Sequence, residues 1–218
     1  MCFSAQASFI TASALSIVSL LSIKKTHNKK LIPLAASPLF FVVQQACEGI
    51  VWLTLNAGDT TSTLHNFAMY SFLFFAGTWW PICIPIILYI PEKIHTRKKL
   101  LSYTFIIGII TAIILFFAWT LQITGVENVN HNLNYPVVNY PFGITNQNIA
   151  CVFSWIISLS YCVATVTPLF ISSIRYTWAL GVAVSLGLIV SYIFYAMTFP
   201  SVWCFFAAVS SIIIYFIV

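Results

Sequence analysis

Seven long apolar stretches, separated by short links, limit how this chain of 218 residues can fold. A helix needs about 20 apolar residues, each rising about 1.5 Å, to cross the hydrocarbon core of a membrane. Hydrophobic residues make up 61% of the sequence and charged residues only 6%, so lipid must surround most of it. We therefore predict an all-α, polytopic helical membrane bundle that forms a single domain over residues 1–218. Its seven transmembrane helices are expected at about 5–23, 31–55, 67–90, 100–123, 148–171, 177–198 and 201–218.

Proline residues mark two places where these spans can break. Only the tetrapeptide TFPS separates the last two spans, and its Pro200 ends a helix but leaves a very tight turn. Five or six crossings, with one buried or re-entrant segment, are therefore the alternative to seven. Pro81 and Pro85 predict a kink inside the third span, because each removes a backbone hydrogen-bond donor.

All nine Lys and Arg residues fall in three links, at 24–30, at 91–99 and at Arg175. Basic links face the cytoplasm, so we predict an N-terminus outside and a C-terminus inside, in a bacterial inner (plasma) membrane. The net charge of +5 does not indicate a nucleic-acid partner, because the basic residues form short clusters without interleaved aromatic residues. The expected partners are the lipid bilayer and a small molecule or ion, and the oligomeric state stays open.

The second span, LFFVVQQACEGIVWLTL (39–55), contains the one acidic residue within any predicted span, Glu48. An acidic residue near mid-membrane costs roughly 2.5–3.5 kcal/mol unless it finds partners inside the bundle. Helical spacing puts Gln44, Gln45 and Trp52 on the same face as Glu48. We interpret this face as a functional site. The alternative is a neutral glutamate that joins helices through hydrogen bonds, each contributing roughly 0.6 kcal/mol.

Other reactive side chains are expected at the same outer level of the membrane. Cys2 and Ser4 begin the first span, Trp203 and Cys204 begin the last, and His131 lies in an outer link. Three interpretations of the cysteines stay open: packing as small apolar residues, a Cys2–Cys204 disulfide, and a zinc or iron site. The ligands of that metal would be Glu48, Cys2, Cys204 and His131, although the sequence has no CxxC, HxxxH or HExxH spacing.

Four sequence blocks, MCFSAQASF, QQACEGIVW, HNLNY and SVWCFFAA, resemble an uncharacterised family of bacterial polytopic membrane proteins whose members open with Met-Cys-Phe-Ser. The resemblance implies a shared architecture and a shared set of site residues, but no reaction. The matching residues are Cys2, Phe3, Ser4, Gln45, Glu48, Gly49, Trp52, His131, Tyr135, Trp203 and Cys204.

These observations predict a polar pocket in the outer half of the bundle, centred on Glu48 and built from the first, second and seventh spans. The Asn-rich link at 124–147 would cover it, and it would bind a small molecule or a metal ion. If the pocket is catalytic, Glu48 would be an acid, a base or a ligand, Cys2 or Cys204 a thiol partner, and His131 a proton carrier. The remaining predicted ligand contacts are Ser4, Gln44, Gln45, Trp52, Tyr135 and Trp203.

The alternatives are a proton-coupled small-solute transporter that uses Glu48 and a non-catalytic membrane assembly protein. No Walker loop, GxSxG or GxGxxG motif is present, and the last span has no Lys for a retinal Schiff base. Whether the protein is an enzyme is left open.

Overall fold

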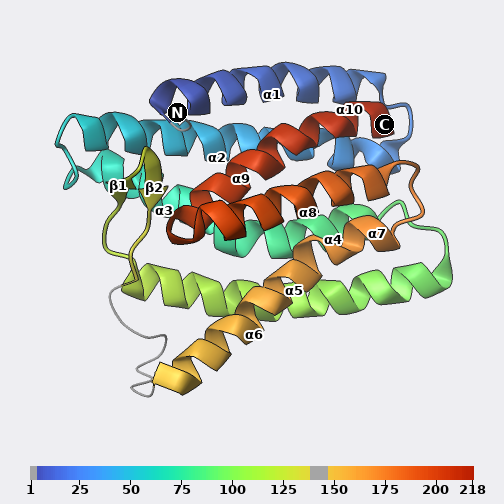
Figure 1. Ribbon diagram of the computed structural model, residues 1–218. Helices are drawn as coiled ribbons and strands as arrows, with labels where there is room; N and C mark the ends of the chain where they lie inside the picture. The colour runs from blue at the N-terminus through green and yellow to red at the C-terminus, as the bar shows by residue number, and fades with distance from the viewer. Residues whose placement is uncertain (1–3, 138–146) are drawn as a thin grey trace.

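The computed structural model describes residues 4–137 and 147–218 and is almost entirely α-helical (Figure 1). Among the described residues, seven helical segments are long and apolar enough to cross a membrane. The last two contain 18 and 22 residues, so both are long enough to cross and the alternatives with fewer spans are not needed. The chain is therefore a multi-pass membrane protein. The seven segments are Ala5–Lys25, Lys29–Asn56, Thr63–Tyr89, His95–Gln122, Gln147–Ile171, Thr177–Phe194 and Ala196–Ile217.

Several spans are composed of more than one helical element, and a two-stranded hairpin follows the fourth span (Figure 1). In chain order the elements are α1 (Ala5–Lys25), η1 (Lys29–Leu31), α2 (Ile32–Asn56), α3 (Thr63–Leu73), η2 (Phe74–Trp79), α4 (Trp80–Tyr89), α5 (His95–Gln122), β1 (Glu127–Val129), β2 (Asn132–Asn134), α6 (Gln147–Thr165), α7 (Thr167–Ile171), α8 (Thr177–Phe194), η4 (Ala196–Thr198), α9 (Phe199–Ser210), η5 (Ser211–Ile213) and α10 (Ile214–Ile217).

All the basic residues lie at one end of the bundle, which we call the inner side, and the opposite end is called the outer side. In Figure 1 the inner side is on the right with the C-terminus, and the β1–β2 hairpin is on the left. The names follow the orientation predicted from the charges. At the inner end of α1, Lys24 and Lys25 occupy the last turn, where a cation interacts favourably with the helix dipole.

The third span changes from α-helical to π-helical geometry just before Pro81, one of the two prolines at which a kink was predicted. Pro81 has no N–H, and the segment η2 just before it is π-helical, so the Trp80 N–H donates to the Phe75 carbonyl. The Ala76 carbonyl that this shift leaves free accepts a hydrogen bond from the Tyr161 hydroxyl of α6. A helix can be broken inside a membrane only when neighbouring groups satisfy its backbone in this way. The interruption thus fixes the position of α6 against the third span.

Glu92 joins two inner links that are far apart in the sequence. Its buried carboxylate accepts hydrogen bonds from the backbone N–H groups of Lys93 and Ile94 and from the backbone and hydroxyl of Ser173. Burial raises the pKa of Glu92, but these hydrogen bonds outweigh it and lower the pKa below its ordinary value. The start of α5 is therefore held to the link between α7 and α8.

The described part of the Asn-rich outer link forms the β1–β2 hairpin. Asn130 and His131 occupy its turn with φ of 51° and 60°, the left-handed pair that a two-residue hairpin turn requires. Beyond the hairpin, the Tyr135 ring stacks on Phe72 of α3 with ring centroids 5.3 Å apart. The link thus packs against the outer half of the bundle, while its residues 138–146 lie outside the described part of the chain.

Candidate functional site

The Glu48 carboxyl group lies buried between α2 and α9. Only 1% of Glu48 and none of Ser201 is exposed. The Ser201 hydroxyl donates to Oε1 of Glu48, and the Gln45 amide nitrogen donates to Oε2 at 3.2 Å. The one acid of the second span is therefore satisfied by a neighbour on its own helix and by the seventh span, as an intramembrane carboxyl requires.

Gln44 extends this polar cluster to the third span. Its amide oxygen accepts a hydrogen bond of 2.8 Å from the indole nitrogen of Trp80, at the start of α4. The Trp80 ring is itself held by stacking on Phe41, with centroids 3.9 Å apart. Gln44 lies one helical turn from Glu48, so a single face of α2 carries hydrogen bonds to both α4 and α9. The spacing of the polar residues predicted this face, but not the partners Trp80 and Ser201.

Four buried polar atoms around Glu48 have no hydrogen-bond partner among the described residues. They are the Gln44 amide nitrogen, the Gln45 amide oxygen, the Trp52 indole nitrogen and the Tyr135 hydroxyl. The Tyr135 hydroxyl lies within electrostatic range of Glu48 and of Cys204. An unpaired buried polar group costs about 1–3 kcal/mol, so such groups are rare and call for an explanation. Four of the eight such atoms among the described residues belong to the Glu48 face of α2 or to Tyr135, and a polar group bound there would satisfy them.

His65 is a further buried group that sequence reasoning misplaced. The predicted third span, about 67–90, left His65 in the link before it. In the structure α3 begins at Thr63 under a cap from Ser62, which brings His65 into the third span with 1% exposure. Its Nδ1 lies 2.7 Å from the Thr54 hydroxyl, which can itself donate to the Ile50 carbonyl. This pattern favours a proton on Nδ1 and a lone pair on Nε2. Nε2 is buried and has no partner within the described ranges.

The other predicted site residues lie at different distances from this cluster. Trp203 and Cys204 are buried in α9, although the Trp203 indole nitrogen points to the Val184 carbonyl at 3.4 Å rather than to Glu48. Ser4 is exposed and its hydroxyl caps α1. His131 is exposed in the hairpin turn. Cys2 lies outside the described residues.

The predicted metal site has no support in the described part of the chain. There, no group of three or more His, Cys, Asp or Glu side chains is placed to hold a metal ion. Cys204 is a free cysteine, and Cys2, the other half of the disulfide considered from the sequence, is not among the described residues. The arrangement around Glu48 is instead one of hydrogen-bond donors and acceptors.

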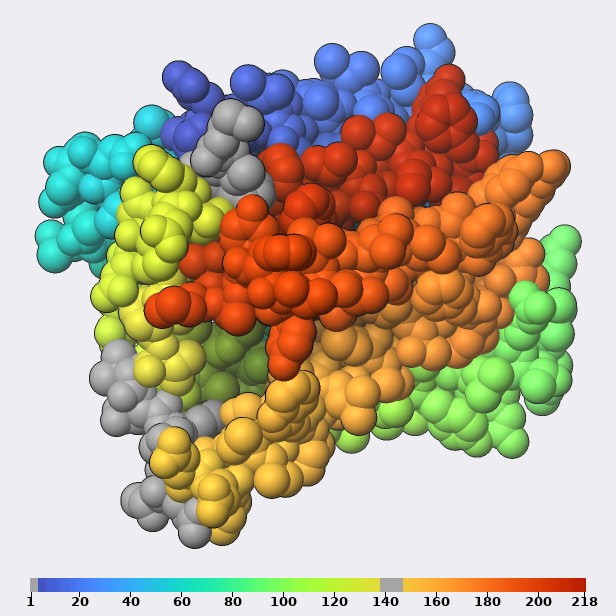
Figure 2. Space-filling model, in the orientation of Figure 1, coloured from blue at the N-terminus to red at the C-terminus, as the bar shows by residue number. Residues whose placement is uncertain are grey.

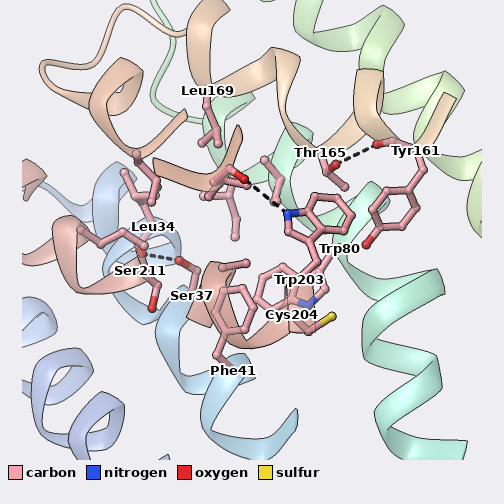
Figure 3. Close-up of a pocket in the computed structure, with 16 residues that line it drawn as sticks. Leu34, Ser37, Phe41, Trp80, Tyr161, Thr165, Leu169, Trp203, Cys204 and Ser211 are labelled. Atoms are coloured by element: carbon pink, nitrogen blue, oxygen red, sulfur yellow. Dashed lines mark hydrogen bonds between the residues drawn. The ribbon is translucent and has the colours of Figure 1, made fainter. Parts of the chain in front are cut away.

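Two cavities meet at Tyr161, Trp203 and Cys204. The first, which we call the outer groove, measures about 580 Å³ and lies between α5, α6 from Cys151 to Cys162, and the junction of α8 with α9. The second, the inner cavity, measures about 70 Å³ and is lined by residues of α2, α4, α6, α8 and α9, with Leu34 and Ser211 among its lining residues (Figure 3). Cys204 also lies within electrostatic range of Glu48 and beside the Gln44 amide. Gln44, Gln45 and Glu48 line neither cavity, but Trp80 and Cys204, which lie against Gln44, line the inner one.

No curated protein and no solved structure matches this chain. The profile of one protein family matches residues 1–218, the full length of the sequence. This agrees with the resemblance to an uncharacterised family that the sequence blocks carry. The chain belongs to this family of unknown function, DUF6629.

Proposed function

We propose that this protein binds a small polar molecule, or the polar part of a larger one, at Glu48 in the outer half of a bacterial inner membrane. The observation that carries the proposal is the set of buried, unpartnered donors and acceptors around the Glu48 carboxyl. A ligand with its own donors and acceptors would remove the cost of leaving these groups unpaired. Catalysis is not required for this role.

The chemistry of the cluster limits the ligand. The Gln44 amide nitrogen and the Trp52 indole nitrogen can only donate, the Gln45 oxygen can only accept, and the Tyr135 hydroxyl can do both. All Lys and Arg residues of the sequence lie in the inner links, so the outer half has no permanent cation to pair with an anionic ligand. An ammonium group has no acceptor for the Gln44 and Trp52 nitrogens, so the cluster favours an uncharged ligand that carries hydroxyl, carbonyl or amide groups.

The inner cavity argues against the transporter alternative. Three of its four hydroxyl side chains, Ser37, Thr165 and Ser211, donate to a carbonyl three or four residues earlier in the chain. The fourth, that of Tyr161, donates to the Ala76 carbonyl, so none of the four offers a free donor to a passing solute. A cavity of about 70 Å³ is also far smaller than the roughly 300–1,000 Å³ of typical ligand pockets. Binding from the outer side needs no such route.

The test is to identify what co-purifies with the protein. Wild type, Glu48→Gln and Glu127→Gln would be purified in detergent, extracted and analysed by mass spectrometry and by elemental analysis. Glu127 makes a matched control because it lies on the exposed hairpin. We expect an organic molecule with wild type and Glu127→Gln that is lost from Glu48→Gln. Equal amounts in all three samples would refute the proposal, and a metal lost only from Glu48→Gln would replace the organic ligand with an ion.

A further inference from the structure

We propose that the ligand is an uncharged amphiphile with one hydrocarbon chain, taken from the outer leaflet, whose chain lies in the outer groove and whose polar group reaches the Glu48 cluster. This inference rests on the proposed function and adds the class of ligand and its route. It is carried by the outer groove, by the depth of that groove in the membrane and by the contact of its inner wall with the polar cluster.

The outer groove exists because α6 diverges from the bundle toward its outer end. Figure 1 shows α6 leaving the other helices at this end, and Figure 2 shows the molecule hollowed between α6 and the outer end of α8. The hydrogen bond from Tyr161 to the Ala76 carbonyl ties the inner half of α6 to the third span. This hydrogen bond does not hold the outer half of α6. The volume of about 580 Å³ is in the range of established ligand pockets.

The groove lies at hydrocarbon depth and is lined for an apolar chain. Trp119, Trp155 and Phe199 contribute rings to it, and no charged side chain is among its described lining residues. Trp155 and Leu159, on the α6 side, are 59% and 68% exposed where the surrounding medium is lipid. A water-soluble molecule would have to cross lipid to reach this opening. A membrane-dissolved molecule reaches it by lateral diffusion.

The inner wall of the groove joins it to the polar cluster. Cys204 lines the groove, while the Gln44 amide lies beside its thiol on the cluster side. Gln44 is fully buried and its amide nitrogen is one of the unpartnered donors. An apolar chain alone would leave that donor with only the Cys204 thiol, a weak acceptor, so an occupant with a polar group at one end suits the site better. An acyl chain of an ordinary phospholipid would bring a phosphate, which has no cation to pair with in the outer half.

The experiment uses monooleoylglycerol, which has one chain and an uncharged head with two hydroxyl groups. Native mass spectrometry of the full-length protein would measure its saturable binding, with oleate and lysophosphatidic acid as charged single-chain competitors. Ser158→Trp fills the groove from an exposed position of α6. Ile156→Trp is the matched control, because Ile156 is 56% exposed on the same helix and does not line the groove.

We expect monooleoylglycerol to bind wild type and Ile156→Trp with equal affinity. Its affinity for Ser158→Trp and for Glu48→Gln should be lower by a factor of about ten or more. Loss in Glu48→Gln alone would leave the proposed function standing and overturn the groove as the route. Loss in Ser158→Trp alone would show a chain-binding groove and refute a site at Glu48. Stronger binding of either anion would overturn the uncharged head. If the wild type is a dimer and Ser158→Trp dissociates it, the groove is an interface between copies and the inference is overturned.

Discussion

Replacing Ser201 with alanine removes the one hydrogen bond that joins the Glu48 carboxyl to the seventh span. Neither residue has access to water, because Ser201 is fully buried and Glu48 is 1% exposed. After the substitution, the Gln45 amide at 3.2 Å is the remaining partner of the carboxyl within the described chain. The variant therefore measures what it costs to leave a buried carboxyl oxygen without its donor.

The expected loss is about 1–2 kcal/mol in the free energy of unfolding. An interhelical hydrogen bond in a membrane protein contributes roughly 0.6 kcal/mol on average and at most about 1.7. An acceptor left unsatisfied in a dry site costs about 1–3 kcal/mol. Because the site is completely buried, we expect the loss in Ser201→Ala to lie nearer about 2 than about 1 kcal/mol. A double-mutant cycle with Glu48→Gln isolates the coupling between the two side chains.

Reversible unfolding in mixed detergent micelles would measure the loss, with Ser211→Ala as the control. Ser211 is equally buried and follows the same helix, but its hydroxyl donates to the Ala208 carbonyl three residues before it. Its removal breaks no hydrogen bond between spans and should cost little. If Ser201→Ala loses no more stability than Ser211→Ala, and the cycle with Glu48 shows no coupling, the reasoning about this site is wrong.

Two further predictions concern the scaffold. In Gly108→Ala the new Cβ would lie 1.9 Å from the Pro81 carbonyl oxygen, so we expect a loss of about 1–3 kcal/mol in the same assay. Gly125→Ala meets nothing within 4 Å, and an equal loss there would contradict the steric argument. Because hydrogen bonds hold the pKa of Glu92 below its ordinary value, its stabilisation is present above about pH 4.3 and is lost as the pH falls through the lowered pKa. Glu92→Gln should therefore cost about 2 kcal/mol at pH 7 and less at pH 3, and equal losses would refute the linkage.

The sequence predicted the crossings well because each is a local property. About 20 apolar residues in a row form a helix in lipid whatever surrounds them, since the backbone must satisfy itself. The seven predicted ranges accordingly match the seven helical segments to within a few residues at most ends. Three spans begin four or five residues earlier than predicted: the third at Thr63 instead of 67, the fourth at His95 instead of 100 and the seventh at Ala196 instead of 201. In the third span the Ser62 cap extends α3 back to Thr63. The predicted position of His65 was wrong because apolar composition does not reveal such a polar cap.

The candidate site was predictable only in part. Periodicity along one helix placed Gln44, Gln45, Glu48 and Trp52 on one face, and the structure finds all four buried. Equal membrane depth was a weaker argument. Ser4 and His131 were predicted at the same level as Glu48, yet both are exposed, because one caps a helix and the other occupies a left-handed turn.

Sequence reasoning left five, six or seven crossings open, but it did establish that the chain is a multi-pass membrane protein and that one helical face carries a carboxyl group inside the bundle. Apolar length and helical period are enough to decide both. Only the tertiary structure decided that Ser201, Trp80 and Tyr135 surround that face, and that a groove beside α6 ends at Cys204. Which helices meet depends on small residues, on a π-helical break and on hydrogen bonds between distant segments, and no local pattern encodes those pairings.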